Sequence, residues 1–138
     1  MKFLQVPSGL AVLIILIGTA CSKQIPVNEE HRPGINRKVR FILHTDNDFA
    51  GDHHTIIFTP FIKNLTNHVL WDSVLTPMQV KDIPDSEHRL IIEKSVPGDD
   101  ASLLKVGFYY TINNVGESWY LDSFKVGDTL KIIDFNFR

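Results

Sequence analysis

Apolar and polar side chains alternate in short runs along most of this chain. In the run at 38–45, Val39, Phe41 and Leu43 share one face, with charged or polar side chains between them. The run at 103–113 keeps the same alternation over a longer stretch. A period of two residues is typical of a half-buried strand. From residue 37 to residue 138 no stretch has the 3.6-residue apolar spacing of a helix, so the pattern predicts an all-β domain.

Turn residues between the runs set the bounds of the predicted strands. Pro-Gly-Asp-Asp at 97–100 is the strongest turn signal. Pro60 has no backbone N–H, so its strand is expected to lie at a sheet edge or to be bulged there. We expect the last two strands to pair with each other through Gly127-Asp128. The predicted strands are 38–45, 54–64, 68–76, a weaker extended piece at 78–83, 89–96, 103–113, 119–126 and 129–138.

Strands of this number cannot all bury an apolar face in one open sheet. We therefore predict that residues 37–138 form an antiparallel two-sheet β-sandwich of immunoglobulin-like or transthyretin-like type, with seven to eight strands. A closed β-barrel is the alternative. The core is expected to consist largely of aromatic rings: Phe41, Phe58, Trp71, Phe108, Tyr110, Trp119, Phe135 and Phe137.

The first 20 residues have the pattern of a signal peptide. Lys2 gives a positive start, residues 10–17 are all apolar, and small residues precede Cys21. A transmembrane helix needs about 20 apolar residues, which is longer than this run. We predict that residues 1–20 are removed. Residues 21–36 would then be a lipidated cysteine followed by a flexible, polar spacer.

The residues around the cleavage point resemble the lipobox of bacterial lipoproteins. Thr19 and Ala20 precede Cys21, the only cysteine in the chain, and Ser22 follows it. The resemblance implies acylation of the Cys21 thiol by palmitate or related chains, cleavage before Cys21, and anchoring of the mature chain to a membrane. Serine after the cysteine favours the outer membrane in that family. Lipobox, polar spacer and sandwich together resemble small bacterial surface or periplasmic lipoproteins.

Composition adds mainly exclusions. The chain is 43% apolar and 22% charged, with a net charge of −2, which is ordinary for a globular protein. A slightly negative net charge does not indicate nucleic-acid binding, which needs an excess of basic residues. A single cysteine excludes an intrachain disulfide and a zinc site of four cysteines, or of two cysteines and two histidines. No G-x-S-x-G motif or glycine-rich phosphate loop occurs. We expect no enzyme activity, with a carbohydrate-active accessory role as the weaker alternative.

Two groups of residues are candidates for binding. The loop 45–54 carries Asp46, Asp48 and Asp52, whose hard oxygens could hold calcium or a small ligand such as a carbohydrate. The alternative is a solvated loop whose aspartates bind backbone N–H groups. Tyr109 and Tyr120 are expected to point outward on neighbouring strands, as an aromatic platform for a sugar or a protein. The sequence thus favours a membrane-tethered, non-catalytic binding or assembly module whose partner is an envelope protein or a glycan.

Overall fold

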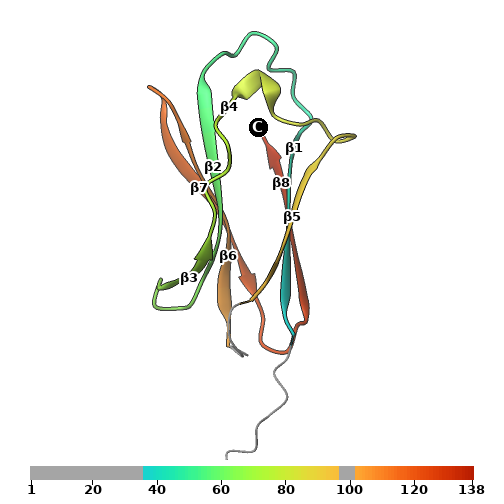
Figure 1. Cartoon of the computed structure of the whole chain (residues 1–138), viewed down its shortest axis with the longest axis vertical. Helices are drawn as coiled ribbons and strands as arrows, with labels where there is room; N and C mark the ends of the chain where they lie inside the picture. The colour runs from blue at the N-terminus through green and yellow to red at the C-terminus, as the bar shows by residue number, and fades with distance from the viewer. Residues whose placement is uncertain (1–35, 97–101) are drawn as a thin grey trace, which may run out of the picture. The chain divides into compact units, whose positions relative to one another are not determined.

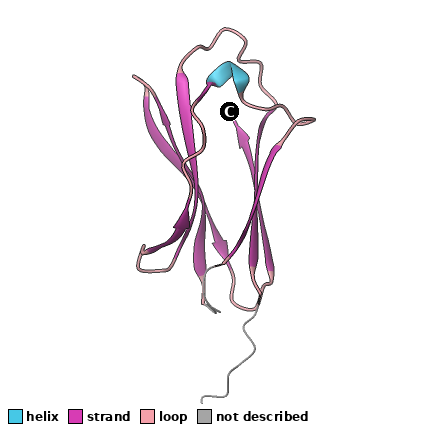
Figure 2. Cartoon of the chain, viewed as in Figure 1, coloured by secondary structure: helices cyan, strands magenta, loops and turns pink. Residues whose placement is uncertain are grey.

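The domain is all-β. The computed structural model describes residues 36–96 and 102–138. The predicted signal peptide, Cys21 and almost all of the predicted spacer lie outside the described residues. The described residues form two sheets and a single short 3-10 helix (Figures 1 and 2). They contain no helix that is long and apolar enough to cross a membrane.

The strands are divided between a smaller and a larger sheet. The smaller sheet has the order β5-β1-β8, formed by β1 (Lys38–Thr45), β5 (Leu90–Ser95) and β8 (Leu130–Phe137). The larger sheet has the order β3-β2-β6-β7, with β4 paired to β2. Its strands are β2 (Thr55–Lys63), β3 (Val69–Asp72), β4 (Met78–Gln79), β6 (Leu104–Ile112) and β7 (Gly116–Phe124). The 3-10 helix η1 (Val80–Asp82) follows β4 and buries Val80.

The two sheets pack face to face, which confirms the predicted sandwich. The Phe41 ring on β1 lies 5.5 Å from the Phe108 ring on β6, and the Phe58 ring on β2 lies 6.3 Å from the Phe135 ring on β8. Edge-to-face and offset ring pairs at such distances are favourable beyond their buried area. In the described residues the sheets stay separate (Figure 1), so the alternative of one closed sheet does not hold.

The partner of the last strand differs from the prediction. β8 does not pair with β7 but crosses to the smaller sheet, where it runs parallel to β1, with Phe41 opposite Ile133. The other strand pairs in the described residues are antiparallel, as predicted. β7 and β8 are linked instead by the ion pair of Asp122 and Lys131, at 2.6 Å. Alternation along a strand fixes its faces but not its neighbour, and for this reason the sequence could not place β8.

Most of the predicted core rings lie in the core, but Trp119 does not. Phe41, Phe58, Phe108 and Phe137 are buried, and Trp71, Tyr110 and Phe135 are partly buried against them. Trp119 is 66% exposed. It lies opposite Tyr109 in the β6–β7 register, on the outer face of the larger sheet. Its size favours burial, but the register decides its face.

The expectation for Pro60 was only partly right. β2 lies inside the larger sheet, and its bulge is between Ile62 and Lys63. The Pro60 carbonyl accepts a hydrogen bond from the Ser73 N–H at 3.2 Å. Since the nitrogen and oxygen of one strand residue point to the same side, the Pro60 nitrogen faces the segment between β3 and β4. The hydrogen-bond ladder between β2 and β3 does not extend to Pro60, so no backbone N–H donor is needed at that residue.

Arg37, just before β1, is a buried charge that the sequence did not reveal. It is 2% exposed. Within residues 36–96 and 102–138 its guanidinium donates hydrogen bonds to four backbone carbonyl oxygens, and it stacks on the Phe124 ring at 3.9 Å. The acceptors are those of Ser102 (2.7 Å), Lys125 (2.9 Å), Phe124 (3.2 Å) and Asp128 (3.2 Å). A single side chain therefore joins the start of β1 to the start of β6 and the β7–β8 turn.

Candidate functional site

Two regions carry the residues singled out for binding: the loop between β1 and β2, and the outer face of the larger sheet. The loop contains the three aspartates proposed for calcium. The outer face contains Tyr109. The contacts made by each region decide what it can do chemically.

The three aspartates of the loop are engaged with separate partners. Asp46 accepts a hydrogen bond from the Asn136 amide at 2.6 Å. Asp48 accepts one from the Ala50 N–H at 2.9 Å, as in an Asx turn. Asp52 bonds to His54. In the described residues no group of three or more histidine, cysteine or carboxylate side chains is arranged to hold a metal ion. The structure therefore does not bring the predicted calcium ligands together.

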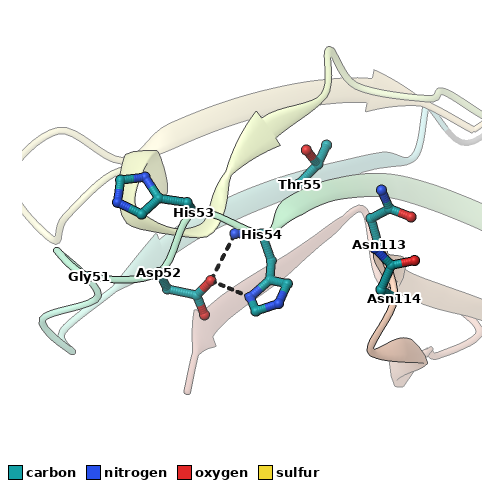
Figure 3. A pocket seen from close by; sticks show the side chains of 7 residues that line it. All are labelled: Gly51, Asp52, His53, His54, Thr55, Asn113 and Asn114. Carbon is teal, nitrogen blue, oxygen red and sulfur yellow. Dashed lines mark hydrogen bonds and ion pairs between the residues drawn. The ribbon is translucent and has the colours of Figure 1, made fainter.

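Asp52 and His54 form a pair at the mouth of an open pocket (Figure 3). One Asp52 oxygen accepts hydrogen bonds from the His54 ring Nδ1 at 2.7 Å and from the His54 backbone N–H at 2.9 Å. These bonds lower the pKa of the Asp52 carboxyl, the backbone bond having the larger effect. Asn113 and Asn114 line the opposite wall (Figure 3).

This pocket is polar and lacks the parts of a nucleophilic site. The Thr55 hydroxyl points away from the His54 ring (Figure 3), so it is not activated by the Asp52–His54 pair. The His53 ring turns toward Gln79, at 3.4 Å. Since His53 and His54 point in different directions, they do not converge on one ligand. The arrangement orders the loop through its own hydrogen bonds.

The outer face of the larger sheet carries an aromatic pair, of which Trp119 is exposed and Tyr109 is half-buried. Tyr109 on β6 lies directly opposite Trp119 on β7. In the next row of the register, Phe61, Gly107 and Leu121 lie side by side. We call the surface formed by Phe61, Tyr109, Trp119 and Leu121, with Lys63, Lys105 and Asn67 at one end, the aromatic face. It encloses a hollow of about 230 Å³.

The predicted partnership of Tyr109 with Tyr120 is wrong. Tyr120 lies opposite Phe108, on the inner side of the sheet. Its ring is 5.3 Å from the Phe135 ring of the opposing sheet. Successive residues of a strand point to opposite faces, so Trp119 takes the outer position that was assigned to Tyr120. Tyr109 is therefore the only one of the two predicted tyrosines on the aromatic face.

Gly107 allows the two strands of the aromatic face to approach closely. A Cβ atom at this position would overlap the backbone carbonyl oxygen of Tyr120. Glycine inside a strand is typical of such a close backbone approach. Gly107 also leaves the row between Phe61 and Leu121 without a central side chain.

Polar groups fix both ends of the aromatic face. The Tyr109 hydroxyl donates a hydrogen bond to a Glu117 carboxylate oxygen, and this bond is the main reason that the pKa of Tyr109 is raised. At the other end, the Lys105 ammonium donates to Asn67 Oδ1 at 2.8 Å and to the Leu65 carbonyl at 3.3 Å. The Lys63 ammonium lies 4.6 Å from the centre of the Phe61 ring.

Sequence reasoning found one residue of the aromatic face, Tyr109, and missed the rest. The signal that could have located Trp119 was the short loop between β6 and β7, in which Ile112 pairs with Gly116. When the loop has three residues, the two members of each cross-strand pair are both odd-numbered or both even-numbered. Tyr109 therefore pairs with Trp119, and the two side chains lie on the same face of the sheet. Nothing in the sequence indicated that the β2–β3 turn would bring Asn67 to Lys105.

Comparisons with protein-family models, with curated proteins and with solved structures found no match to this chain.

Proposed function

We propose that this chain is a non-catalytic binding module of the bacterial cell envelope. It is held at a membrane by lipid on Cys21 and binds its partner through the aromatic face. The observation that carries the binding role is the exposure of Trp119 beside Tyr109 on the outer face of the larger sheet.

Exposure of these side chains is costly unless they contact something else. Trp119 is 66% exposed and Leu121 is 50% exposed, on adjacent rows of β7. Burying a large apolar side chain is worth about 1.5–3 kcal/mol, and contiguous exposed apolar surface is typical of an interaction site. Tryptophan and tyrosine are also the residue types most enriched among binding hot spots. This combination supports a ligand-binding face.

The membrane tether is supported by the sequence of residues 1–22 alone. Anchoring two components at one surface raises their effective concentration, so a tethered module can use a partner that it binds only weakly. The pocket beside Asp52 and His54 does not favour a catalytic alternative, because the Thr55 hydroxyl points away from the His54 ring. For this reason the proposal is a binding role rather than a hydrolytic one.

The proposal can be tested by retention of the full chain on isolated bacterial envelope, with Cys21→Ser in every variant so that no lipid anchor contributes to retention. The variant Trp119→Ala removes the central ring of the aromatic face. Ile132→Ala is the matched control, because Ile132 is 48% exposed on β8 of the smaller sheet, away from the aromatic face. Truncation of an interface hot spot costs about 2 kcal/mol or more, which corresponds to about 30-fold weaker binding. We expect wild type and Ile132→Ala to be retained and Trp119→Ala to be lost.

Melting temperatures of the same variants provide the folding control. Because Trp119 is mostly exposed, its truncation should leave the melting temperature within a few degrees of wild type. Equal retention of the folded Trp119→Ala and wild-type chains would refute the proposed binding face.

A further inference from the structure

The aromatic face carries more information about its ligand than its apolar character alone. Resting on the proposed function, we infer that its ligand is an acidic carbohydrate: sugar rings stack on Trp119 and Tyr109, while a carboxylate of the same chain binds Lys63 and Lys105. The inference depends on the backbone pairing beneath the face, on the rings, and on the two lysines.

The backbone of β6, in the middle of the aromatic face, is not available to a ligand. β6 pairs with β2 on one side and with β7 on the other, over residues 105–112. An extended peptide that adds to a sheet needs a free edge with unpaired N–H and C=O groups. Over β6 only side chains are offered, so recognition by strand addition is excluded there. This favours a ligand that binds through its own flat faces and hydroxyl groups. In the described residues the outer edge of β7 has no partner strand, and the polyglutamate probe below tests whether a peptide uses it.

The two rings suit the apolar faces of sugars. Trp119 and Tyr109 lie on adjacent strands at paired positions, and neighbouring strands are about 4.8 Å apart. The C–H groups on one side of a pyranose ring carry a small positive charge, and the face of an aromatic ring carries a negative one. The bond to Glu117 fixes the Tyr109 hydroxyl and so holds the ring in one orientation.

The two lysines give one end of the aromatic face a net positive charge. Lys105 is held by two neutral acceptors, Asn67 Oδ1 and the Leu65 carbonyl oxygen. Lys63 lies over the Phe61 ring, which is also neutral. Among the described residues, neither lysine forms an ion pair with a carboxylate. Both ammonium groups are held in position by neutral neighbours, and a ligand carboxylate is the complementary group.

The charge is confined to one end. The register places Lys63 and Lys105 in one row, with the aromatic pair four residues further along β6. Glu117 lies beyond the pair, in the row of Thr111. An acidic chain bound along β6 would thus have a carboxylate near the lysines, rings over Trp119 and Tyr109, and hydroxyl groups near Glu117.

The test uses three probes on the full chain: tetragalacturonate, its fully methyl-esterified form, and polyglutamate of equal charge. Binding is measured by calorimetry and by tryptophan fluorescence; Trp119 and the half-buried Trp71 are the two tryptophans of the chain. We expect tetragalacturonate to bind at least about fivefold more tightly than its ester, which corresponds to one exposed ion pair. Lys63→Gln combined with Lys105→Gln should abolish that difference. Trp119→Ala should weaken both sugars about 30-fold, and Ile132→Ala neither.

Each other outcome overturns the inference in a distinct way. Equal binding of the acid and its ester would show a neutral sugar ligand, and equal binding of polyglutamate would show an acidic peptide. In both cases the proposed binding face would stand. If retention on the envelope depends on Trp119 but neither sugar binds, the carbohydrate ligand is refuted and the proposed binding face stands. Retention that does not depend on Trp119 would overturn both proposals.

Discussion

Replacement of Arg37 by alanine is the sharpest test of how the domain is held together. The guanidinium bonds to the carbonyls of Ser102, Phe124, Lys125 and Asp128, and the bond to Phe124 is buried. A hydrogen bond to a charged group contributes about 1.5–3 kcal/mol. Water can reach the carbonyls that are only partly buried, so the bonds do not add in full. We expect a loss of about 3–5 kcal/mol in the free energy of unfolding.

The assay is urea unfolding followed by circular dichroism. A domain of this size has a total stability of about 5–15 kcal/mol, so the expected loss is a large share of it. Arg40→Ala is the control, because Arg40 forms an exposed ion pair with Glu93 and such pairs contribute about 0–1 kcal/mol. Arg37→Lys keeps the charge but not the planar fork of donors, and should lie between the two. The reasoning is refuted if Arg37→Ala and Arg40→Ala unfold at the same urea concentration.

Further predictions concern the aromatic face, the loop and the N-terminus. Gly107→Ala should lower the free energy of unfolding by about 1–3 kcal/mol, measured in urea, because the new methyl group meets the Tyr120 carbonyl; unchanged stability would contradict the close approach of β6 and β7. In an ultraviolet pH titration Tyr109 should ionise above the ordinary range of a tyrosine, because its hydroxyl bonds to Glu117; ionisation within that range would contradict the bond. The hydrogen bond between Tyr109 and Glu117 stabilises the fold below the ordinary tyrosine pKa of about 10. This stabilisation is lost as the pH rises through the raised pKa of Tyr109. The substitution E117Q should bring the pKa of Tyr109 back toward its ordinary value. Chain extracted from membranes should carry acyl groups on Cys21 in intact mass spectra, and Cys21→Ser should carry none. The melting temperature should be the same in EDTA and in calcium, and a rise of several degrees with calcium would contradict the separate roles of the loop aspartates.

Local alternation was enough to predict the strands and the two-layer fold. Val39, Phe41 and Leu43 all point into the core, as their spacing predicts. Each strand carries its own pattern, and the pattern needs only its immediate neighbours in sequence. The same local information cannot tell which strands pair, so the parallel pairing of β8 with β1 was not predicted.

The errors at individual residues have a common cause. Trp119 was placed in the core by its size, although apolar side chains also occupy a large part of protein surfaces. His44, one of the polar side chains that alternate with the apolar ones in the run at 38–45, is only 7% exposed, and its ring Nε2 lies 2.9 Å from an Asp134 carboxylate oxygen. Arg37 was treated as the start of the domain. In each case the outcome depends on residues far away in sequence.

The parallel pairing of β1 and β8 has a consequence for how the chain reaches its native state. The first strand of the domain finds one of its two partners only in the last, with Thr45 opposite Phe137 across 92 positions of sequence. Such distant pairing is entropically costly and slows folding. A nascent polypeptide that leaves the ribosome therefore cannot complete the smaller sheet until β8 has been synthesised. Up to that point one side of β1 has no partner strand, and its unpaired N–H and C=O groups are open to pairing with another chain.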